Sequence, residues 1–241
     1  MSKHPTSDPV KNFIPYLENV LLIGERGAFK TSVAYALARC VASGKPFAGL
    51  PVGQRQVIWD SYDNLDPRDT AYHALTGQTS GITESSDLFQ ATADQDLLKP
   101  TLDYIAETAK IKPSGCLLVL DDIEQTAGAT LATDRWLTSV MGTLTTNLRC
   151  NINLLVTLTA TRDDLKDQYK NLARQFSTIL EVERWGSEYW NLRVVSSKNA
   201  PEQFEVDGQV QFVLVETDMS GALRVPVAVP NDLLAHNARS F

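Results

Sequence analysis

One stretch decides the fold of this chain: Gly24-Glu25-Arg26-Gly27-Ala28-Phe29-Lys30-Thr31-Ser32. The apolar residues 19–23 precede it and predict a buried strand, and residues 31–41 follow it with the apolar spacing of a helix. A strand, a glycine-containing loop and a helix in this order bring backbone N–H groups and the positive end of a helix dipole to one anion site. Residues 24–32 are therefore predicted to bind the phosphates of a nucleotide.

Individual loop residues have predicted tasks. Gly24 allows the turn out of the strand, and Gly27 can adopt a positive φ that lets N–H groups face a ligand. Lys30 supplies a charge for the β- and γ-phosphates, and Thr31 supplies the hydroxyl that usually binds Mg²⁺. Phe29 departs from the strict pattern, which has glycine before the lysine, so its ring must pack away from the phosphates. The alternative is an ordinary glycine turn with Lys30 on the surface.

Acidic residues follow two further predicted strands. The apolar run 116–120 ends in Asp121 and Asp122, and the strand 56–60 is followed by Asp63. The carboxyl ends of parallel strands share one edge of a sheet, where α/β proteins bind their ligands. Asp121 is predicted to hold Mg²⁺ through water. Asp122 either assists in catalysis or caps the next turn, and Asp63 either orients a water or caps the following helix.

The C-terminal part of the chain predicts more strands. Residues 153–159 form the next core strand, and its last residue, Thr159, is either a sensor of the γ-phosphate or a plain strand-end threonine. Strands at 178–182, 190–196 and 209–215 follow without long helices between them, which indicates an antiparallel extension of the sheet. The fold class is therefore α/β, with a mostly parallel central sheet flanked by helices and an antiparallel C-terminal extension.

The remaining segments complete this prediction. We expect one domain over residues 1–241, with a flexible start at 1–12 and a tail at 231–241 that can form a short helix. Further predicted elements are helices at 67–75, 101–112 and 134–148, a short strand at 88–91, loops at 77–86 and 124–133, and a solvated loop or helix face of mixed charge at 160–171.

The bulk composition limits the classes of function. The net charge of −7 over 241 residues provides no global field for nucleic acid, so any such contact must come from a local patch or a ring of subunits. The three cysteines share no metal-ligand spacing, which favours buried thiols in a reducing cytosol. The first residues are polar, and no apolar run approaches ~20 residues, so we expect no signal peptide, no membrane span and a cytoplasmic location.

These landmarks, in this order, resemble the RepA-like branch of the RecA-type P-loop ATPases. That branch includes hexameric replicative helicases of plasmids and related phage proteins. The resemblance extends from about residue 20 to about residue 215. It is carried by the loop 24–31, the strand-edge acid Asp63, the strand end 120–121 and the block 178–183.

The resemblance implies ATP as the nucleotide and Mg²⁺ as the metal. Lys30 and Thr31 would hold the phosphates and the metal, with Asp121 supporting the metal. Asp63 stands where the family has a catalytic glutamate that polarises water, and it is one methylene shorter.

The resemblance also implies residues that act between subunits. Thr159 falls where relatives often have a larger polar residue that couples the γ-phosphate to DNA loops. Arg174 resembles the arginine finger that relatives insert into a neighbour's site, and Lys198 resembles a second cation acting in the same way. For each of these two cations, a surface salt bridge is the alternative.

Three functional hypotheses follow from the motifs and the resemblance together. The first is an oligomeric, ring-forming ATPase, expected to be a hexamer, that acts on single-stranded DNA as a helicase or translocase in replication or recombination. The second is a nucleotide-dependent regulator or loader of replication or recombination proteins with slow or no hydrolysis. The third, ranked last, is a metabolic P-loop kinase, because the chain shows no arginine-rich lid.

Overall fold

The computed structural model describes most of the chain. The described residues are 8–11, 13–15, 18–61, 65–77, 81–85, 115–126, 152–198, 204–217 and 221–230. Of the predicted elements, the strand at 88–91, the helices at 101–112 and 134–148 and the tail at 231–241 lie outside these residues.

A nine-stranded sheet forms the frame of the molecule, with the strand order β3-β2-β4-β5-β1-β6-β7-β8-β9. The strands are β1 Asn19–Gly24, β2 Gln56–Ser61, β3 Ile82–Ser85, β4 Cys116–Asp121, β5 Ile152–Thr159, β6 Thr178–Trp185, β7 Tyr189–Ser197, β8 Glu205–Thr217 and β9 Gly221–Pro230. The described helices are α1 Lys30–Ser43, α2 Asp66–Thr76, α5 Ile123–Thr126, α7 Arg162–Lys166 and α8 Lys170–Ala173.

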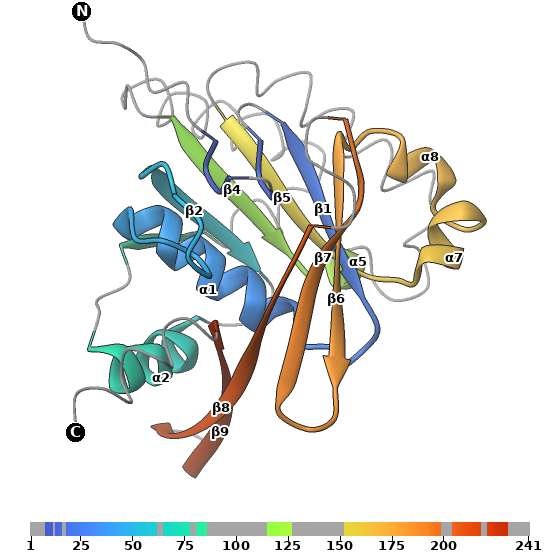
Figure 1. Ribbon diagram of the computed structural model, residues 1–241. Coiled ribbons are helices and arrows are strands. Elements are labelled where there is room, and N and C mark those ends of the chain that lie inside the picture. The colour runs from blue at the N-terminus through green and yellow to red at the C-terminus, as the bar shows by residue number, and fades with distance from the viewer. Residues whose placement is uncertain are drawn as a thin grey trace, which may run out of the picture.

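The strands from β3 to β6 in this order pair in parallel, and β1, β4 and β5 are buried along almost their whole length. Helix α1 lies against one face, and α7 and α8 lie near the other, whereas α2 packs against β8 and β9 (Figure 1). Alternate residues of β1 belong to two separate cores: Val20 and Leu22 pack on the α1 side, whereas Leu21 and Ile23 pack with Leu165 of α7. Burial on both faces explains why β1, β4 and β5 are unbroken apolar runs in the sequence.

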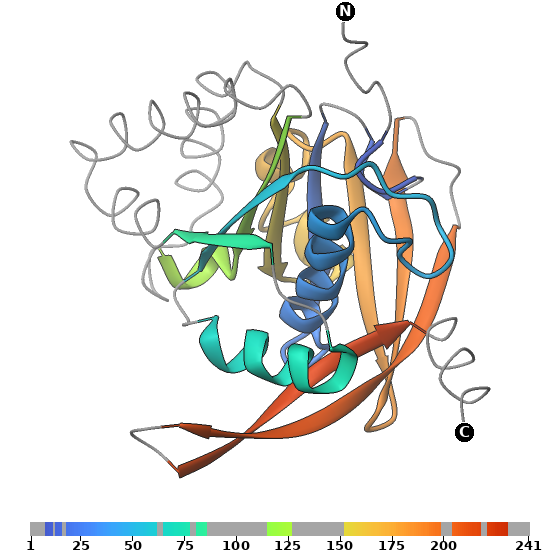
Figure 2. The same ribbon diagram turned by 90° about the vertical axis from the view of Figure 1, so that its left-hand side faces the viewer.

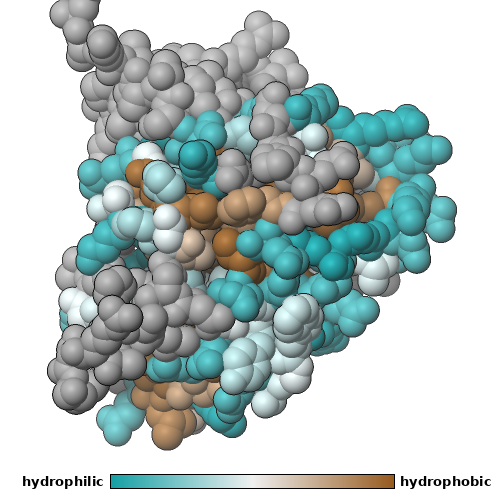
Figure 3. Space-filling model, viewed as in Figure 1, coloured by the Kyte–Doolittle hydropathy of each residue, from teal (hydrophilic) through white to brown (hydrophobic). Residues whose placement is uncertain are grey.

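The strands β6 to β9 pair antiparallel and extend the sheet. The long hairpin β8–β9 crosses below α1 and beside α2 (Figure 2). Its far end carries Leu214 and Leu223, whose side chains are exposed, and hydrophobic colour gathers at the corresponding lower end of the space-filling view (Figure 3). The near part of the hairpin is buried, so it contributes to the core on the α1 side.

Most predicted elements within the described residues are present, with three differences. Strand β9 was not predicted, because its sequence contains Pro226 and Pro230; proline is tolerated here because β9 is the edge strand. Strand β3 lies inside the predicted loop 77–86 and gains its hydrogen bonds from β2. The predicted loop 124–133 begins within the helical turn α5.

Two further observations concern the ends and the helices of the chain. Val10, inside the segment 1–12 for which the sequence predicts a flexible start, is fully buried and pairs with Ile14 and Val52. In the described part of the chain, no helix is long and apolar enough to span a membrane.

Candidate phosphate-binding site

The loop between β1 and α1 packs closely against the neighbouring strand β6. A Cβ atom on Gly24 would lie 2.6 Å from the carbonyl oxygen of Val182, which is closer than carbon and oxygen atoms can approach without a backbone shift. Gly27 has a φ of 81°, the positive value that the sequence predicted. The loop path therefore depends on glycine at its first position.

Phe29 occupies the position of the missing glycine and adopts the backbone that glycine would favour. Its φ of 67° and ψ of 22° are left-handed, a conformation that costs an ordinary residue about 1 kcal/mol. The ring packs edge-on against Phe212 of β8 with centroids 6.2 Å apart, and the Arg184 guanidinium lies 5.0 Å from the ring centroid. The ring thus packs away from the loop interior, and these contacts offset the backbone cost.

Helix α1 begins without a side-chain cap. Phe29 is its N-cap residue, no side chain accepts a cap hydrogen bond, and the first turn contains no acidic residue. The first N–H groups of the helix and the helix dipole therefore give the loop a partial positive charge. Ser32 donates a hydrogen bond of 3.0 Å to the carbonyl of Pro226, which ties this turn to β9.

The Lys30 ammonium is held inside the loop. The residue is 8% exposed, and its Nζ donates to the backbone oxygen of Glu25 at 3.1 Å. Burial lowers the pKa of Lys30, whereas the carboxylates of Glu124, Asp122 and Asp121 act in the opposite direction. The negative charge of a bound phosphate would act on Lys30 in the same direction as these carboxylates and would favour the charged ammonium.

Thr31 and Asp121 meet beside the loop. The Thr31 hydroxyl donates to Asp121 Oδ1 at 3.2 Å, and the Thr157 hydroxyl of β5 donates to the same oxygen at 2.7 Å. Burial raises the pKa of the Asp121 carboxyl to about 6, although hydrogen bonds from Thr157 and Thr31 lower it. A hydroxyl and a carboxylate are hard oxygen donors, and this pair fits a magnesium ion that also binds phosphate and water.

Asp122 and Thr159 lie on the same edge of the sheet. Asp122 has a φ of 59°, rare for a residue other than glycine, and its N–H donates to the Thr157 hydroxyl at 2.7 Å. Thr159 stands opposite Gly24 in the β1–β5 ladder, directly beside the start of the loop. The structure therefore brings Asp121, Asp122 and Thr159 to the phosphate loop, as their places at strand ends predicted.

Asp63 lies outside the described residues, but the end of its strand is described. Ser61 of β2 stands opposite Asp121 in the parallel ladder. The described part of β2 therefore ends level with Asp121 of β4.

Arg174 and Lys198 are not brought to the loop of their own chain. Both are exposed, and the Lys198 N–H donates to the oxygen of Ser177, immediately before β6. Thr178 stands opposite Val20 near the start of β1, whereas the loop leaves the other end of that strand. Four strand residues, about 13 Å of backbone, lie between Val20 and the loop, and Lys198 is bonded to Ser177 beyond the far end of this segment.

Glu124 is a site residue that the sequence patterns did not reveal. It lies on α5, and its Oε1 accepts a hydrogen bond of 2.9 Å from the backbone N–H of Thr159. No local pattern marked it, because Asp121 ends a strand, Asp122 has a positive φ and α5 contains only residues 123–126.

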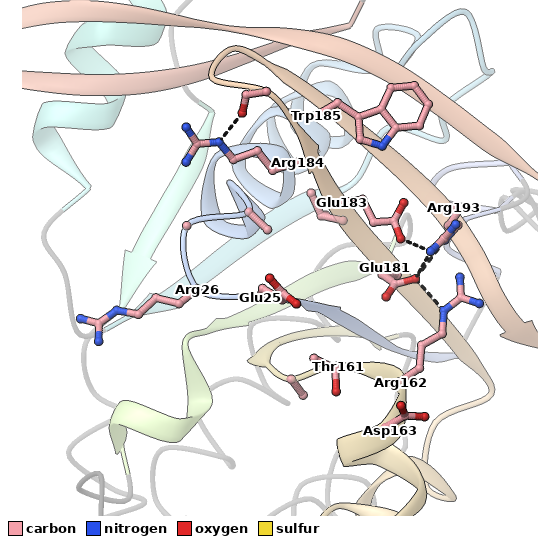
Figure 4. Close-up of a pocket in the computed structure, with 15 residues that line it drawn as sticks. Glu25, Arg26, Thr161, Arg162, Asp163, Glu181, Glu183, Arg184, Trp185 and Arg193 are labelled. Atoms are coloured by element: carbon pink, nitrogen blue, oxygen red, sulfur yellow. Dashed lines mark hydrogen bonds and ion pairs between the residues drawn. The ribbon is translucent and has the colours of Figure 1, made fainter.

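A cavity of about 750 Å³ opens beside the first half of the loop (Figure 4). Its walls come from the loop, from the start of α7 and from the hairpin β6–β7. In Figure 4 the Glu181 carboxylate lies between two arginines, at 2.7 Å from Arg162 Nε and 2.8 Å from Arg193 Nη2. Arg193 also pairs with Glu183, while Trp185 on the hairpin is 56% exposed. The cavity has the size of a small-molecule site.

Comparison with known proteins identifies the family. The family model described as an AAA domain matches residues 2–149, which is more than half of the chain and includes the loop, Asp121 and Glu124. A comparison with curated proteins finds no match. Together with a phosphate loop that places a threonine hydroxyl on a buried strand-end aspartate, this match shows that the chain belongs to the AAA domain family of nucleotide-binding P-loop ATPases.

Proposed function

We propose that this ATPase forms a ring-shaped oligomer that acts on DNA. The oligomer couples ATP hydrolysis to movement on single-stranded DNA. The observation that carries the proposal is the distance of Arg174 and Lys198 from the phosphate loop of their own chain. A cation that stabilises the transition state of phosphoryl transfer must touch the phosphates. In this proposal, those two residues act in the site of a second copy.

The residues of one chain bind the triphosphate in this proposal. Loop amides and the start of α1 hold the phosphates, and Lys30 exchanges its bond to the Glu25 carbonyl for phosphate oxygens. Thr31 and Asp121 would hold Mg²⁺, which supplies charge neutralisation for the β- and γ-phosphates when bound.

Two chains complete the site. Arg174 and Lys198 of one copy lie at the same end of its sheet, next to the start of β6. An oligomer that sets this end against a neighbour's loop brings both cations to the γ-phosphate, where they offset the charge of the transition state. The sequence predicts that Asp63 orients the attacking water.

Mixing two inactive variants tests the shared site. Lys30→Ala removes the phosphate-binding charge, and Arg174→Ala removes the proposed finger, so each variant alone is expected to be inactive. A mixture contains sites with an intact Lys30 from one copy and an intact Arg174 from its neighbour, so hydrolysis should return. If the mixture remains as inactive as its components, Arg174 does not act between subunits.

The DNA-directed part of the proposal has its own test. Phosphate release by the wild-type protein is measured with and without single-stranded DNA, and particle mass is measured by mass photometry with and without ATP. Stimulation by DNA together with an ATP-dependent oligomer is the expected result. Turnover that DNA leaves unchanged contradicts a translocase.

A nucleotide-dependent regulator or loader of replication or recombination proteins is the second candidate. The net charge of −7 and the short Thr159 side chain at the end of β5 favour it, because neither provides a strong link to DNA. Tight binding of ATP with negligible turnover supports this candidate, and strand unwinding excludes it.

A further inference from the structure

Glu124 carries a carboxylate oxygen that the described structure leaves without a hydrogen bond. Its Oε1 accepts from the Thr159 N–H at 2.9 Å, whereas Oε2 is buried and has no hydrogen-bond partner among the described residues. A buried and unpaired carboxylate oxygen is costly, since it loses water and gains nothing in return. Such an atom at a functional site is explained by a partner that arrives with the ligand.

The position of Glu124 indicates what that partner is. The residue lies on α5, three residues after Asp121, and its hydrogen bond fixes it to the strand end that stands opposite Gly24. Among the carboxylates that raise the pKa of Lys30, Glu124 has the largest effect, which agrees with its place beside the strand end opposite Gly24. Lys30 is the group that meets the β- and γ-phosphates, so Glu124 borders the γ-phosphate end of a bound nucleotide.

A carboxylate in this position repels a bound phosphate, so its presence beside the loop calls for a functional explanation. Asp121 already fits the metal through its contact with Thr31. The Glu124 carboxylate is anchored through one oxygen, and its second oxygen remains available to accept a proton. An anchored base next to the reacting group is the arrangement that general-base catalysis requires.

We propose that Glu124 Oε2 orients and deprotonates the water that attacks the γ-phosphorus of bound ATP. The water oxygen forms a bond to phosphorus, and the bond between phosphorus and the bridging oxygen breaks with its electron pair leaving on ADP. The proton passes to Glu124 Oε2 and from there to the released phosphate. The inference deepens the proposed function and rests on it, since it assumes ATP hydrolysis at this loop.

The Glu124→Gln variant separates the base from the anchor. The glutamine carbonyl still accepts from the Thr159 N–H, but the side chain can no longer take a proton at neutral pH. We expect single-turnover hydrolysis to fall by about 100-fold or more. Binding of Mg·ATP, measured by calorimetry, should be as tight as in the wild type or tighter, because a negative charge next to the phosphates is removed.

Two variants serve as controls. Glu188→Gln removes an exposed carboxylate on the β6–β7 turn and should leave hydrolysis and thermal unfolding unchanged. Asp63→Asn removes the carboxylate that the sequence predicted to orient the water, and hydrolysis by this variant should exceed that of Glu124→Gln.

The outcomes are distinguishable. Normal hydrolysis by Glu124→Gln overturns the inference, as does a loss of ATP binding together with a lower unfolding temperature, which would make the residue merely structural. If Asp63→Asn alone abolishes hydrolysis, the base is Asp63 and the inference is again wrong. If the wild type binds no ATP, the proposed function fails before Glu124 is tested.

Discussion

The parallel strands β1 to β6 and the antiparallel strands β7 to β9 contribute to the site in different ways. The parallel half presents the reactive groups, because the loop, Asp121 and Thr159 all lie at the carboxyl ends of its strands. The antiparallel half presents none of these groups, but it supports the loop through Phe212 and Pro226. Chemistry and support therefore come from separate regions, and substitutions in the two regions should have separable effects.

This separation also explains how the loop functions with a phenylalanine in place of glycine. A left-handed phenylalanine is unfavourable by itself, but the hairpin β8–β9 and Arg184 provide contacts for its ring. A departure from the loop pattern in the parallel half is thus offset by packing against Phe212 of the antiparallel half and Arg184 of β6.

The largest expected effect is that of Lys30→Ala in the parallel half. Removing the buried ammonium should lower ATP hydrolysis by about 1000-fold, since the phosphates lose the cation that the loop holds in its interior. The fold should persist, because burying the Lys30 ammonium costs desolvation free energy and the side chain is not part of either hydrophobic core of the described residues. Phosphate release measures hydrolysis, and thermal unfolding measures stability. Loss of the fold in Lys30→Ala would contradict the separation of chemistry and support between the two halves.

Asp121→Asn should reduce activity and raise stability. Loss of the carboxylate weakens the metal site, and hydrolysis is expected to fall by about 100-fold. Without Mg²⁺ at neutral pH the variant should unfold at a higher temperature, since asparagine still accepts from Thr31 and Thr157 without burying a charge.

The stability difference for Asp121→Asn should depend on pH. Burial raises the folded pKa of Asp121 to about 6 from an ordinary value of 3.8. The protonated acid therefore contributes stability below pH 3.8, and this contribution is lost as the pH rises through 6. Urea unfolding of both proteins should diverge over this range, and a constant difference would contradict the prediction.

Gly208→Ala tests the antiparallel half. A Cβ on Gly208 would lie 2.4 Å from both the buried Trp190 ring and the carbonyl oxygen of Val229. The free energy of unfolding should fall by about 2 kcal/mol through overpacking, while hydrolysis by the folded fraction remains normal. Ser187→Ala on the exposed turn is the control and should change neither quantity.

The smallest expected effect is the difference in stability between the variants Phe29→Ala and Phe29→Gly. Both variants lose the ring contacts with Phe212 and Arg184, so any difference between them isolates the backbone. Glycine accepts the left-handed conformation freely, and its variant should be more stable by about 1 kcal/mol. Equal stabilities by urea unfolding would show that the loop changes its conformation when the ring is removed.

The sequence predicted the parallel half more completely than the antiparallel half. Strands β1, β4 and β5 are buried on both faces, so their apolar runs are unmistakable, and their terminal polar residues mark the edge with the site. Strand β9 escaped prediction because proline is compatible only with an edge position, which a local pattern does not reveal. Glu124 escaped because four residues of helix are too short to show a period.

The sequence by itself determined the phosphate loop, the strand-end acids and the parallel core, because each depends on residues that are adjacent along the chain. Only the tertiary structure decided which of these groups meet. It placed Thr31 on Asp121, attached Glu124 to Thr159, and provided the Phe29 ring with partners from β6 and β8. It also placed Arg174 and Lys198 near the start of β6, at the end of the sheet away from the phosphate loop. The physical reason is that strand order and register, which join distant segments, are set by packing of the whole sheet and not by local propensity.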